Sequence, residues 1–313
     1  MNKTAIVFPG QGSQKVGMCF DFYEKFGSVK KIFDSLAPSI KEVIFEGSQE
    51  SLNLTVNAQP ALFAADLACA AALGEIGFEA DGAAGFSLGE IPALVYCGVL
   101  GFSHGLEFVN FRAKTMQNCA EKNKGGMAAV MGLSAEKIIA ICEEIDGAYP
   151  ANFNSAAQTV VAFSESSYDE LAVAIAAQKG KAIRLAVSGA FHSPLMNEAA
   201  DEIKAYLQKC IFNVASQPIY ANVTAQVYGE PGRMGEQRRA FCAATNPKDL
   251  LSRHVNSPVK WQETIENMTR DGFDTFIEAG PGKTLSGLIK KINPGANAFN
   301  VFDLQSLENF KNR

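Results

Sequence analysis

The stretch that decides the fold runs from Gly82 to Leu100 and reads GAAGFSLGEIPALVYCGVL. Its start is a short apolar run that predicts a buried strand, and the largely apolar pattern over Glu90–Leu100 predicts a helix. Ser87 stands between the two, with Gly85 two residues before it and Gly89 two residues after it. A strand, a tight turn and a helix with small residues at these places form a nucleophile elbow, from which the serine hydroxyl projects.

The Gly-x-Ser-x-Gly pattern is short and also arises by chance as a turn of small residues, so the pattern alone leaves both interpretations open. Its setting favours a nucleophile, because the helix after Ser87 directs free backbone N–H groups and a partial positive charge at the turn. Such an arrangement stabilises an oxyanion. We therefore predict that Ser87 is a nucleophile that accepts an acyl group.

A serine nucleophile needs a base, and the sequence contains three histidines. His104 follows Ser103, a candidate helix cap, and we expect a polar role for it at a helix start. His192 stands in a turn of small residues between a strand end and a helix start, whereas His254 lies in a polar loop. Both follow Ser87 in chain order, and His192 ranks first on its position. No acidic residue can be singled out to orient either ring.

Arg112 is the most informative charged residue. On a helix from His104 to Cys119 it shares a face with apolar side chains, and an unpaired guanidinium in such surroundings is costly. Its helical neighbours three and four residues away include no acid; they are Phe108, Val109, Thr115 and Met116. The partner is therefore either a distant Asp or Glu, in a structural ion pair, or the carboxylate of a substrate held by two guanidinium N–H groups.

The composition excludes several classes of function. The chain has 313 residues, of which 47% are hydrophobic, and a formal net charge of −5. It can therefore build a sizeable core, but it lacks the basic character of a nucleic-acid-binding protein. The apolar run Ala5–Phe8 is too short for a signal peptide, and no later stretch reaches the ~20 apolar residues of a spanning helix. We expect neither nucleic acid nor a membrane as a partner.

Cysteines and glycine-rich turns point to no metal and no bound nucleotide. The seven cysteines are odd in number and form no Cys-x-x-Cys pair, so we expect no disulfides, no zinc site and a reducing cytoplasm as the location. Gly10-Gln11-Gly12 lacks the third glycine of a dinucleotide-binding loop, and Gly280–Thr284 lacks the upstream glycine of a P-loop. We interpret both as turns before helices.

Residues 124–189 form a unit of their own. We expect strands at 127–133, 149–153, 159–163 and 181–187, a helix capped by Ser134 and another begun by a capping box at Ser167–Glu170. The order βαββαβ is that of a ferredoxin-like fold. The predicted class is therefore α/β, with a parallel sheet in an α/β-hydrolase-like catalytic domain, formed by residues 1–123 and 190–313, and an inserted ferredoxin-like subdomain.

Taken together, these residues resemble one known family over nearly the whole chain. It comprises the malonyl-CoA:acyl-carrier-protein transacylases of bacterial fatty-acid synthesis, to which the acyltransferase domains of polyketide synthases are similar. Many segments in the same order are more specific than any one motif. The segments are Phe8–Gln14, Gly85–Glu90, Arg112–Gln117, Gly126–Leu133, Ala151–Ser155, Phe191–Met196, Ser257–Trp261 and Glu278–Leu285.

The resemblance implies a role for each residue of the site. Ser87 would carry the acyl group, and His192 would act as its base and then as the acid for the leaving thiol. Backbone N–H groups of Gln11 and Leu88 would hold the oxyanion, and Arg112 would hold the malonyl carboxylate. A backbone carbonyl near position 254, and not an acid, would orient His192. Side chains expected around these groups are those of His254, Met116 and Phe191, whose ring would disfavour a branched acyl chain.

The same resemblance implies the reaction and its partners. The chain would move a malonyl group from malonyl-CoA to the phosphopantetheine thiol of acyl carrier protein in a ping-pong scheme, in the cytoplasm and as a monomer. It needs no cofactor, because CoA is carried by the substrate, and no metal. Candidates for contact with an acidic carrier are Lys290, Lys291, Arg238 and Arg239.

Two positions depart from the family pattern. Phe86 stands where the family usually has histidine, and His254 stands where it often has glutamine. If the side chain at position 254 matters, its titration near neutrality would shift the pH profile. Competing hypotheses are a serine hydrolase with the same elbow, which leaves Arg112 without a purpose, and a non-catalytic scaffold; a related transferase that serves polyketide synthesis is a third.

Overall fold

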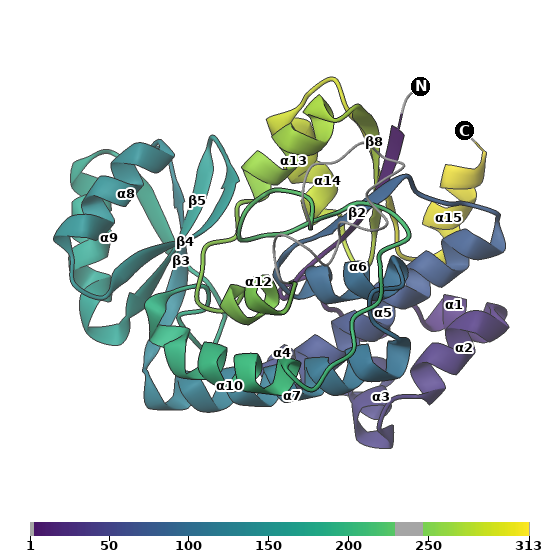
Figure 1. Ribbon diagram of the computed structural model, residues 1–313. Coiled ribbons are helices and arrows are strands. Elements are labelled where there is room, and N and C mark those ends of the chain that lie inside the picture. The colour runs from purple at the N-terminus through teal and green to yellow at the C-terminus, as the bar shows by residue number, and fades with distance from the viewer. Residues whose placement is uncertain (1–2, 229–246, 313) are drawn as a thin grey trace.

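The computed structural model describes residues 3–228 and 247–312. Its larger part is built on a sheet of five parallel strands in the order β7-β2-β1-β8-β9 (Figure 1). The predicted α/β class with a parallel sheet is confirmed. The strands are β1 (Lys3–Phe8), β2 (Gly82–Gly85), β7 (Ile219–Tyr220), β8 (Phe273–Ala279) and β9 (Asn297–Val301).

Helices cover both faces of this sheet, and the central strand β1 shows why. Its side chains alternate, so that Ile6 and Phe8 join one apolar core while Ala5 and Val7 join the other. The second core is closed by α13 (Trp261–Arg270) and α14 (Thr284–Ile292). The first is closed by α1 (Phe20–Lys25), α2 (Gly27–Asp34), α3 (Pro38–Phe45), α4 (Gln49–Asn53), α5 (Thr55–Glu75), α6 (Glu90–Tyr96), α7 (Phe102–Lys122), α10 (Asn197–Leu207), α12 (Pro247–Arg253) and α15 (Leu304–Lys311).

Helix α5 is the central helix of the first core. By length and composition it could cross a membrane, and 83% of its most apolar window is buried inside the protein. The expectation that no stretch has this character was wrong for α5. Polar residues such as Gln59 and Asp66 interrupt its apolar run, yet both are themselves buried. Its burial among other helices marks it as a core helix.

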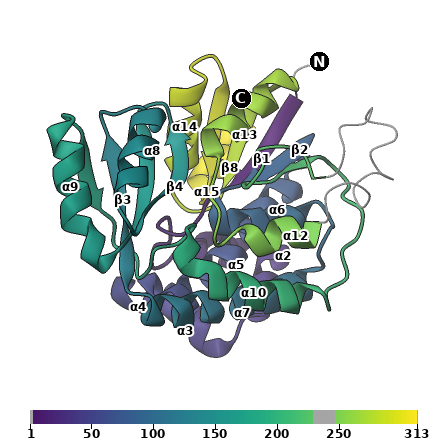
Figure 2. The ribbon, with the colours of Figure 1, turned by 60° about the vertical axis from the view of Figure 1, so that its left-hand side comes forward.

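The second sheet confirms the ferredoxin-like prediction. It is antiparallel with the order β4-β5-β3-β6, and two helices cover its outer face (Figure 2). Ala128 and Val130 of β3 face these helices, whereas Met127 and Ala129 join the core of the larger part. The elements are β3 (Gly125–Met131), α8 (Ala135–Glu144), β4 (Ala148–Ser155), β5 (Gln158–Ser164), α9 (Tyr168–Ala177) and β6 (Lys181–Arg184).

Three local predictions need correction. Ser103 is not a cap, because α7 begins at Phe102 and its N-cap is Gly101. Ser134 does occupy the N-cap of α8, but the predicted capping box at Ser167 is absent: the Ser167 hydroxyl donates to the Asp146 carbonyl at 2.6 Å instead of bonding the helix. The last strand of the subdomain also ends early, at Arg184, and the next three residues line a cavity.

Candidate active site

Ser87 occupies a turn that only glycines on either side permit. Strand β2 ends at Gly85, a short 3-10 turn follows at Ser87–Gly89, and α6 begins at Glu90. A Cβ on Gly85 would lie 1.9 Å from the Gly89 carbonyl carbon, and a Cβ on Gly89 would lie 2.1 Å from the Phe8 carbonyl oxygen. Ser87 itself has a φ of 50°, a strained value for a residue with a side chain. The predicted elbow is therefore present.

The histidine that meets Ser87 is His192. Its Nε2 lies 2.8 Å from Ser87 Oγ, and its Nδ1 lies 2.8 Å from the backbone carbonyl of His254. A carbonyl only accepts, so Nδ1 carries the hydrogen and Nε2 is free to accept the serine proton. No carboxylate contacts the ring among the described residues. His104, by contrast, lies in the first turn of α7.

Burial keeps His192 neutral. The ring is only 3% exposed, and burial, together with the positive charge of Arg112, lowers the pKa of His192 to about 4. A neutral imidazole can accept a proton at physiological pH, which is what a base for Ser87 requires. The positive charge of Arg112 acts in the same direction as burial, because it disfavours a second charge on the imidazole.

Arg112 is buried, and the described residues give it no ion-pair partner. Its side chain is 2% exposed, and one guanidinium nitrogen donates to Gln59 Oε1 at 2.7 Å. The other terminal nitrogen is buried and has no hydrogen-bond partner among the described residues. Burial lowers the pKa of Arg112 to about 10, while the charge of Glu90 acts in the opposite direction. Within the described ranges no carboxylate lies within ion-pair distance, which favours an external carboxylate over the structural ion pair.

The side chains predicted around these groups are all buried. Met116 Sδ accepts a hydrogen bond from Gln59 Nε2 at 3.4 Å, so the same glutamine holds Met116 and Arg112. Phe191 is 5% exposed and packs against the backbone of Gly189, where a Cβ would lie 3.0 Å from the ring. Gln59 was not found from the sequence. A polar residue within an apolar helix was the signal that could have revealed it.

His254 is wholly buried and remains neutral. Burial, followed by the charge of Arg112, lowers its pKa well below the usual value. Its ring Nε2 lies 3.2 Å from Asn222 Oδ1. Because the ring does not titrate near neutrality, the shift of the pH profile considered from the sequence is not expected.

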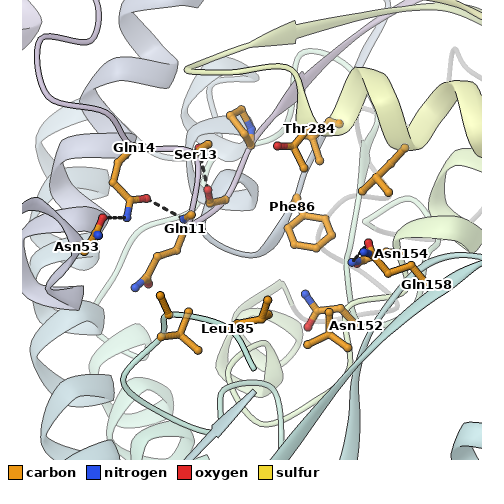
Figure 3. Close-up of a pocket in the computed structure, with 18 of the residues that line it drawn as sticks. Gln11, Ser13, Gln14, Asn53, Phe86, Asn152, Asn154, Gln158, Leu185 and Thr284 are labelled. Atoms are coloured by element: carbon orange, nitrogen blue, oxygen red, sulfur yellow. Dashed lines mark hydrogen bonds between the residues drawn. The ribbon is translucent and has the colours of Figure 1, made fainter. Parts of the chain in front are cut away.

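A cavity of about 490 Å³ borders the turn at Phe86, the residue before Ser87 (Figure 3). It lies between the N-terminal loop and the subdomain, and Phe86 and Gln11 project into it from the side of the elbow. The Phe86 ring packs edge-on against Trp261, with ring centroids 5.5 Å apart. The other lining residues are Pro9, Gly10, Gly12, Ser13, Gln14, Gln49, Asn53, Asn152, Asn154, Gln158, Val160, Leu185, Ala186, Val187, Thr284, Leu285 and Leu288.

The N-terminal loop is held against the elbow. Strands β1 and β2 pair in parallel with Phe8 opposite Gly85, and the Phe86 N–H donates to the Phe8 carbonyl at 2.9 Å. A Cβ on Gly10 would lie 2.5 Å from the Phe86 carbonyl oxygen, so only glycine fits there. Gln11 is the next residue. Its backbone and that of Leu88, the residue after Ser87, are thus brought to the same turn.

The other candidate groups of the sequence are cysteines and exposed lysines. Residues 3–228 and 247–312 hold no group of three or more His, Cys, Asp or Glu side chains that could bind a metal ion. Six cysteines there are free thiols; Cys242 lies outside the described residues, as do Arg238 and Arg239. Lys290 donates to the Ala296 carbonyl, and Lys291 is exposed on α14.

Comparisons with known proteins identify the family of the chain. A family model described as an acyl transferase domain matches residues 5–295. A malonyl CoA-acyl carrier protein transacylase of Bacillus subtilis (strain 168) is 37% identical over 318 residues, which cover 98% of this chain and 96% of the relative.

Solved structures of such enzymes superpose closely. An acyl carrier protein S-malonyltransferase from Vibrio cholerae is 36% identical with a TM-score of 0.88, covering 99% of this chain and 100% of that one. A malonyl-transacylase solved in complex with a type II polyketide synthase acyl-carrier protein is 34% identical, with a TM-score of 0.87 and 98% of both chains covered. With its elbow, its histidine and its buried arginine in place, this chain belongs to the malonyl CoA-acyl carrier protein transacylase family of acyl transferases.

Proposed function

We propose that this protein is an [acyl-carrier-protein] S-malonyltransferase, which transfers the malonyl group of malonyl-CoA to the phosphopantetheine thiol of acyl carrier protein for fatty-acid synthesis. The assignment of malonyl as the acyl group rests on the environment of Arg112. A guanidinium that is 2% exposed, with one terminal nitrogen that has no hydrogen-bond partner in the described part of the chain, suits a carboxylated acyl group. A hydrolase of uncharged esters has no use for that group.

The first half-reaction loads the serine. Ser87 Oγ gives its proton to His192 Nε2 and attacks the thioester carbonyl, so that an O–C bond forms and an oxyanion develops. The N–H groups of Gln11 and Leu88 hold this oxyanion in our proposal, each contributing about 2.7–4 kcal/mol. When the C–S bond breaks, His192 returns its proton to the sulfur, and CoA leaves as a free thiol.

The second half-reaction reverses these roles. The pantetheine thiol of the carrier gives its proton to His192, and its sulfur attacks the malonyl-serine carbonyl. The O–C bond then breaks, and the proton returns to Ser87 Oγ. The hydrogen bond from His192 Nδ1 to the His254 carbonyl holds the ring in one tautomer through both halves.

The cavity in front of the turn suits a pantetheine arm. Its volume of about 490 Å³ falls within the range of small-molecule sites. Side-chain amides of Asn152 and Gln158 lie on its subdomain side, where they can bond the amides of such an arm, and the Phe86 ring offers an apolar contact. We propose that residues 1–123 and 190–313 carry the chemistry and that 124–189 form the other wall of this cavity.

Further parts of the proposal concern the setting of the reaction. The protein acts as a monomer in the cytoplasm, with acyl carrier protein as its macromolecular partner and without a resident cofactor or metal. The solved relative in complex with a carrier protein supports this choice of partner. Lys290 and Lys291, both exposed on α14, are candidate contacts for an acidic carrier.

Mass spectrometry of the intact protein tests the function directly. After incubation with malonyl-CoA, the protein should gain one malonyl group on Ser87, and addition of holo acyl carrier protein should move that group to the carrier thiol. Release of free malonate at the rate of acylation, with no malonyl-carrier product, would favour the serine hydrolase. The absence of any malonyl-protein would favour a non-catalytic scaffold.

A further inference from the structure

Asn222 holds both backbone groups that flank Phe86 in the nucleophile turn. Its Nδ2 donates to the Gly85 carbonyl at 2.5 Å, and its Oδ1 accepts from the Ser87 N–H at 2.8 Å. The orientation of the carboxamide is fixed, since a carbonyl can only accept and a backbone N–H can only donate. The residue is 1% exposed and does not line the cavity.

These two bonds continue the sheet beyond the end of a strand. β7 pairs with β2 in parallel, with Ile219 opposite Ala83 and Tyr220 opposite Ala84, and it ends at Tyr220. A longer β7 would bond the next residues of β2 through its backbone. Instead the Asn222 side chain makes those bonds, and it carries the pairing as far as Ser87.

The backbone of Asn222 is therefore free to hold the other side of the turn. Its N–H donates to Glu90 Oε2 at 2.8 Å, and Glu90 is the first residue of α6. The other carboxylate oxygen of Glu90 accepts from the Tyr228 hydroxyl. One residue thus contacts the strand before the nucleophile, the nucleophile itself and the helix after it.

Asn222 also contacts the residue that orients the base. His254 Nε2 lies 3.2 Å from Asn222 Oδ1, and His254 Nδ1 is buried without a partner among the described residues. Because Oδ1 only accepts, the ring hydrogen is on Nε2. The carbonyl of the same His254 accepts from His192 Nδ1 at 2.8 Å. Asn222 Oδ1 therefore accepts hydrogen bonds from both the Ser87 N–H and the ring of His254, the residue whose carbonyl orients His192.

We propose that Asn222 is a positioning residue that sets the placement of Ser87 and His192 relative to each other. The inference rests on the proposed function, because acyl transfer is the step that this placement serves. Ser87 has a φ of 50° and His192 a φ of 61°, and such backbone values persist only where the surroundings fix them. Loss of the carboxamide frees both residues at once.

The experiment measures single-turnover acylation of the full chain over a range of malonyl-CoA concentrations. Intact-protein mass spectrometry detects the malonyl group at each time point. In Asn222→Ala the acylation rate at saturation should fall about 10²-fold, as for a small misplacement of reacting groups. The half-saturating concentration should stay within about twofold, because the side chain does not contact the cavity. A merely structural role would lower the amount of folded protein and leave the rate of that protein unchanged.

Asn267→Ala is the matched control. Asn267 is also buried, at 5% exposed, and its Nδ2 donates at 2.6 Å to the Ala225 carbonyl in the loop that follows Asn222. It makes no bond to the nucleophile turn. Its replacement should lower stability but keep the wild-type acylation rate. Equal slowing in both variants would show that general loosening of this loop is responsible and would overturn the inference.

Asn222→Asp covers the case in which the alanine variant does not fold. It keeps the shape and the acceptor for Ser87 and His254, but it sets an oxygen against the Gly85 carbonyl, so a slower rate is again expected. A wild-type acylation rate in either folded Asn222 variant would overturn the inference about Asn222 but leave the proposed function standing. A wild-type protein that takes up no malonyl group would overturn the proposed function and this inference with it.

Discussion

Ser87 and His192, 105 residues apart in the chain, meet at 2.8 Å between Oγ and Nε2, and both have positive φ values, 50° and 61°. Two strained residues in contact are rare outside sites where geometry matters, and each costs about 1–3 kcal/mol. The surroundings that offset this cost are the glycine-flanked turn for Ser87 and, for His192, the bonds to the backbone of Val255 and His254.

Ser87→Ala should abolish the malonyl-enzyme and lower turnover by about 10⁴-fold or more, because it removes the hydroxyl that carries the acyl group in the proposed reaction. The measurement is intact mass after incubation with malonyl-CoA. Ser48→Ala is a suitable control, since Ser48 caps α4: it should cost about 1 kcal/mol of stability and leave acylation intact. Normal acylation of Ser87→Ala would exclude the assignment.

Arg112→Ala should invert the preference for malonyl-CoA over acetyl-CoA. Truncation of one partner of a buried charge pair costs about 2–5 kcal/mol, so kcat/KM for malonyl-CoA should fall by a factor of at least about 30. Acetyl-CoA, which has no carboxylate, should lose far less. Arg112→Lys keeps the charge but loses the two-pronged geometry. Its kcat/KM for malonyl-CoA should lie between the values of the wild type and of Arg112→Ala. An unchanged ratio of the two substrates would contradict the role.

The pH dependence of kcat/KM should be flat near neutrality and fall only on acidification through about pH 4. Below that value His192 carries the proton that it must accept from Ser87, because burial and Arg112 lower its pKa to about 4. A bound malonyl carboxylate offsets the charge of Arg112, so the pKa seen in kcat should be higher than that in kcat/KM. Acetyl-CoA should show no such difference. An acidic limb near the unperturbed value of about 6.5 in kcat/KM would contradict this account.

His254→Gln keeps an amide N–H that can donate to Asn222 Oδ1 in place of the ring. It should therefore leave acylation between pH 6 and 8 unchanged but make the protein less sensitive to acid. The unfolded chain protonates this ring near its usual pKa of 6.5, whereas the folded chain, in which the pKa lies well below that value, does not. The wild type therefore loses stability as the pH falls below about 6.5, by up to about 1.4 kcal/mol per pH unit from this residue. Denaturant unfolding of both proteins at several pH values measures the difference; parallel curves would refute it.

Gly85→Ala should prevent correct folding, since the added Cβ would lie 1.9 Å from the Gly89 carbonyl carbon. We expect a loss of about 3 kcal/mol or more. Gly287→Ala is the contrasting variant, because Gly287 lies in α14 with no atom within 4 Å of its added Cβ. It should raise the free energy of unfolding by about 0.5–1 kcal/mol. Thermal unfolding compares the two, and a well-folded Gly85→Ala protein would contradict the steric argument.

The parts of the site that depend on short-range geometry could be predicted from the sequence. The crowding between positions 85 and 89 is local, so the spacing of Gly85, Ser87 and Gly89 predicts the elbow, whereas the approach of the Phe8 carbonyl to Gly89 appears only in the fold. Arg112 depends on the period of a single helix, which places it among apolar neighbours. The choice of His192 over His254 needed the family resemblance, because residue types and order in the chain permit both.

Residues that act through distant backbone atoms could not be predicted. Asn222 follows a strand of two residues, too short for a periodic pattern, and its partner Ser87 is 135 residues away. The capping box at Ser167 failed for a related reason, because the Asp146 carbonyl, 21 residues earlier, takes the hydroxyl. A sequence motif indicates hydrogen-bond partners a few residues away, whereas the fold brings in partners that are distant in the chain.

The contact between Phe86 and Trp261 gives the molecule its own optical probe. Trp261 is the chain's only tryptophan, its indole is 0% exposed, and its N–H has no hydrogen-bond partner within residues 3–228 and 247–312. Its neighbour Phe86 borders the cavity. Tryptophan emission therefore originates directly behind one wall of that cavity, and we expect stopped-flow emission excited at the red edge of tryptophan absorption to report occupancy in real time without a label.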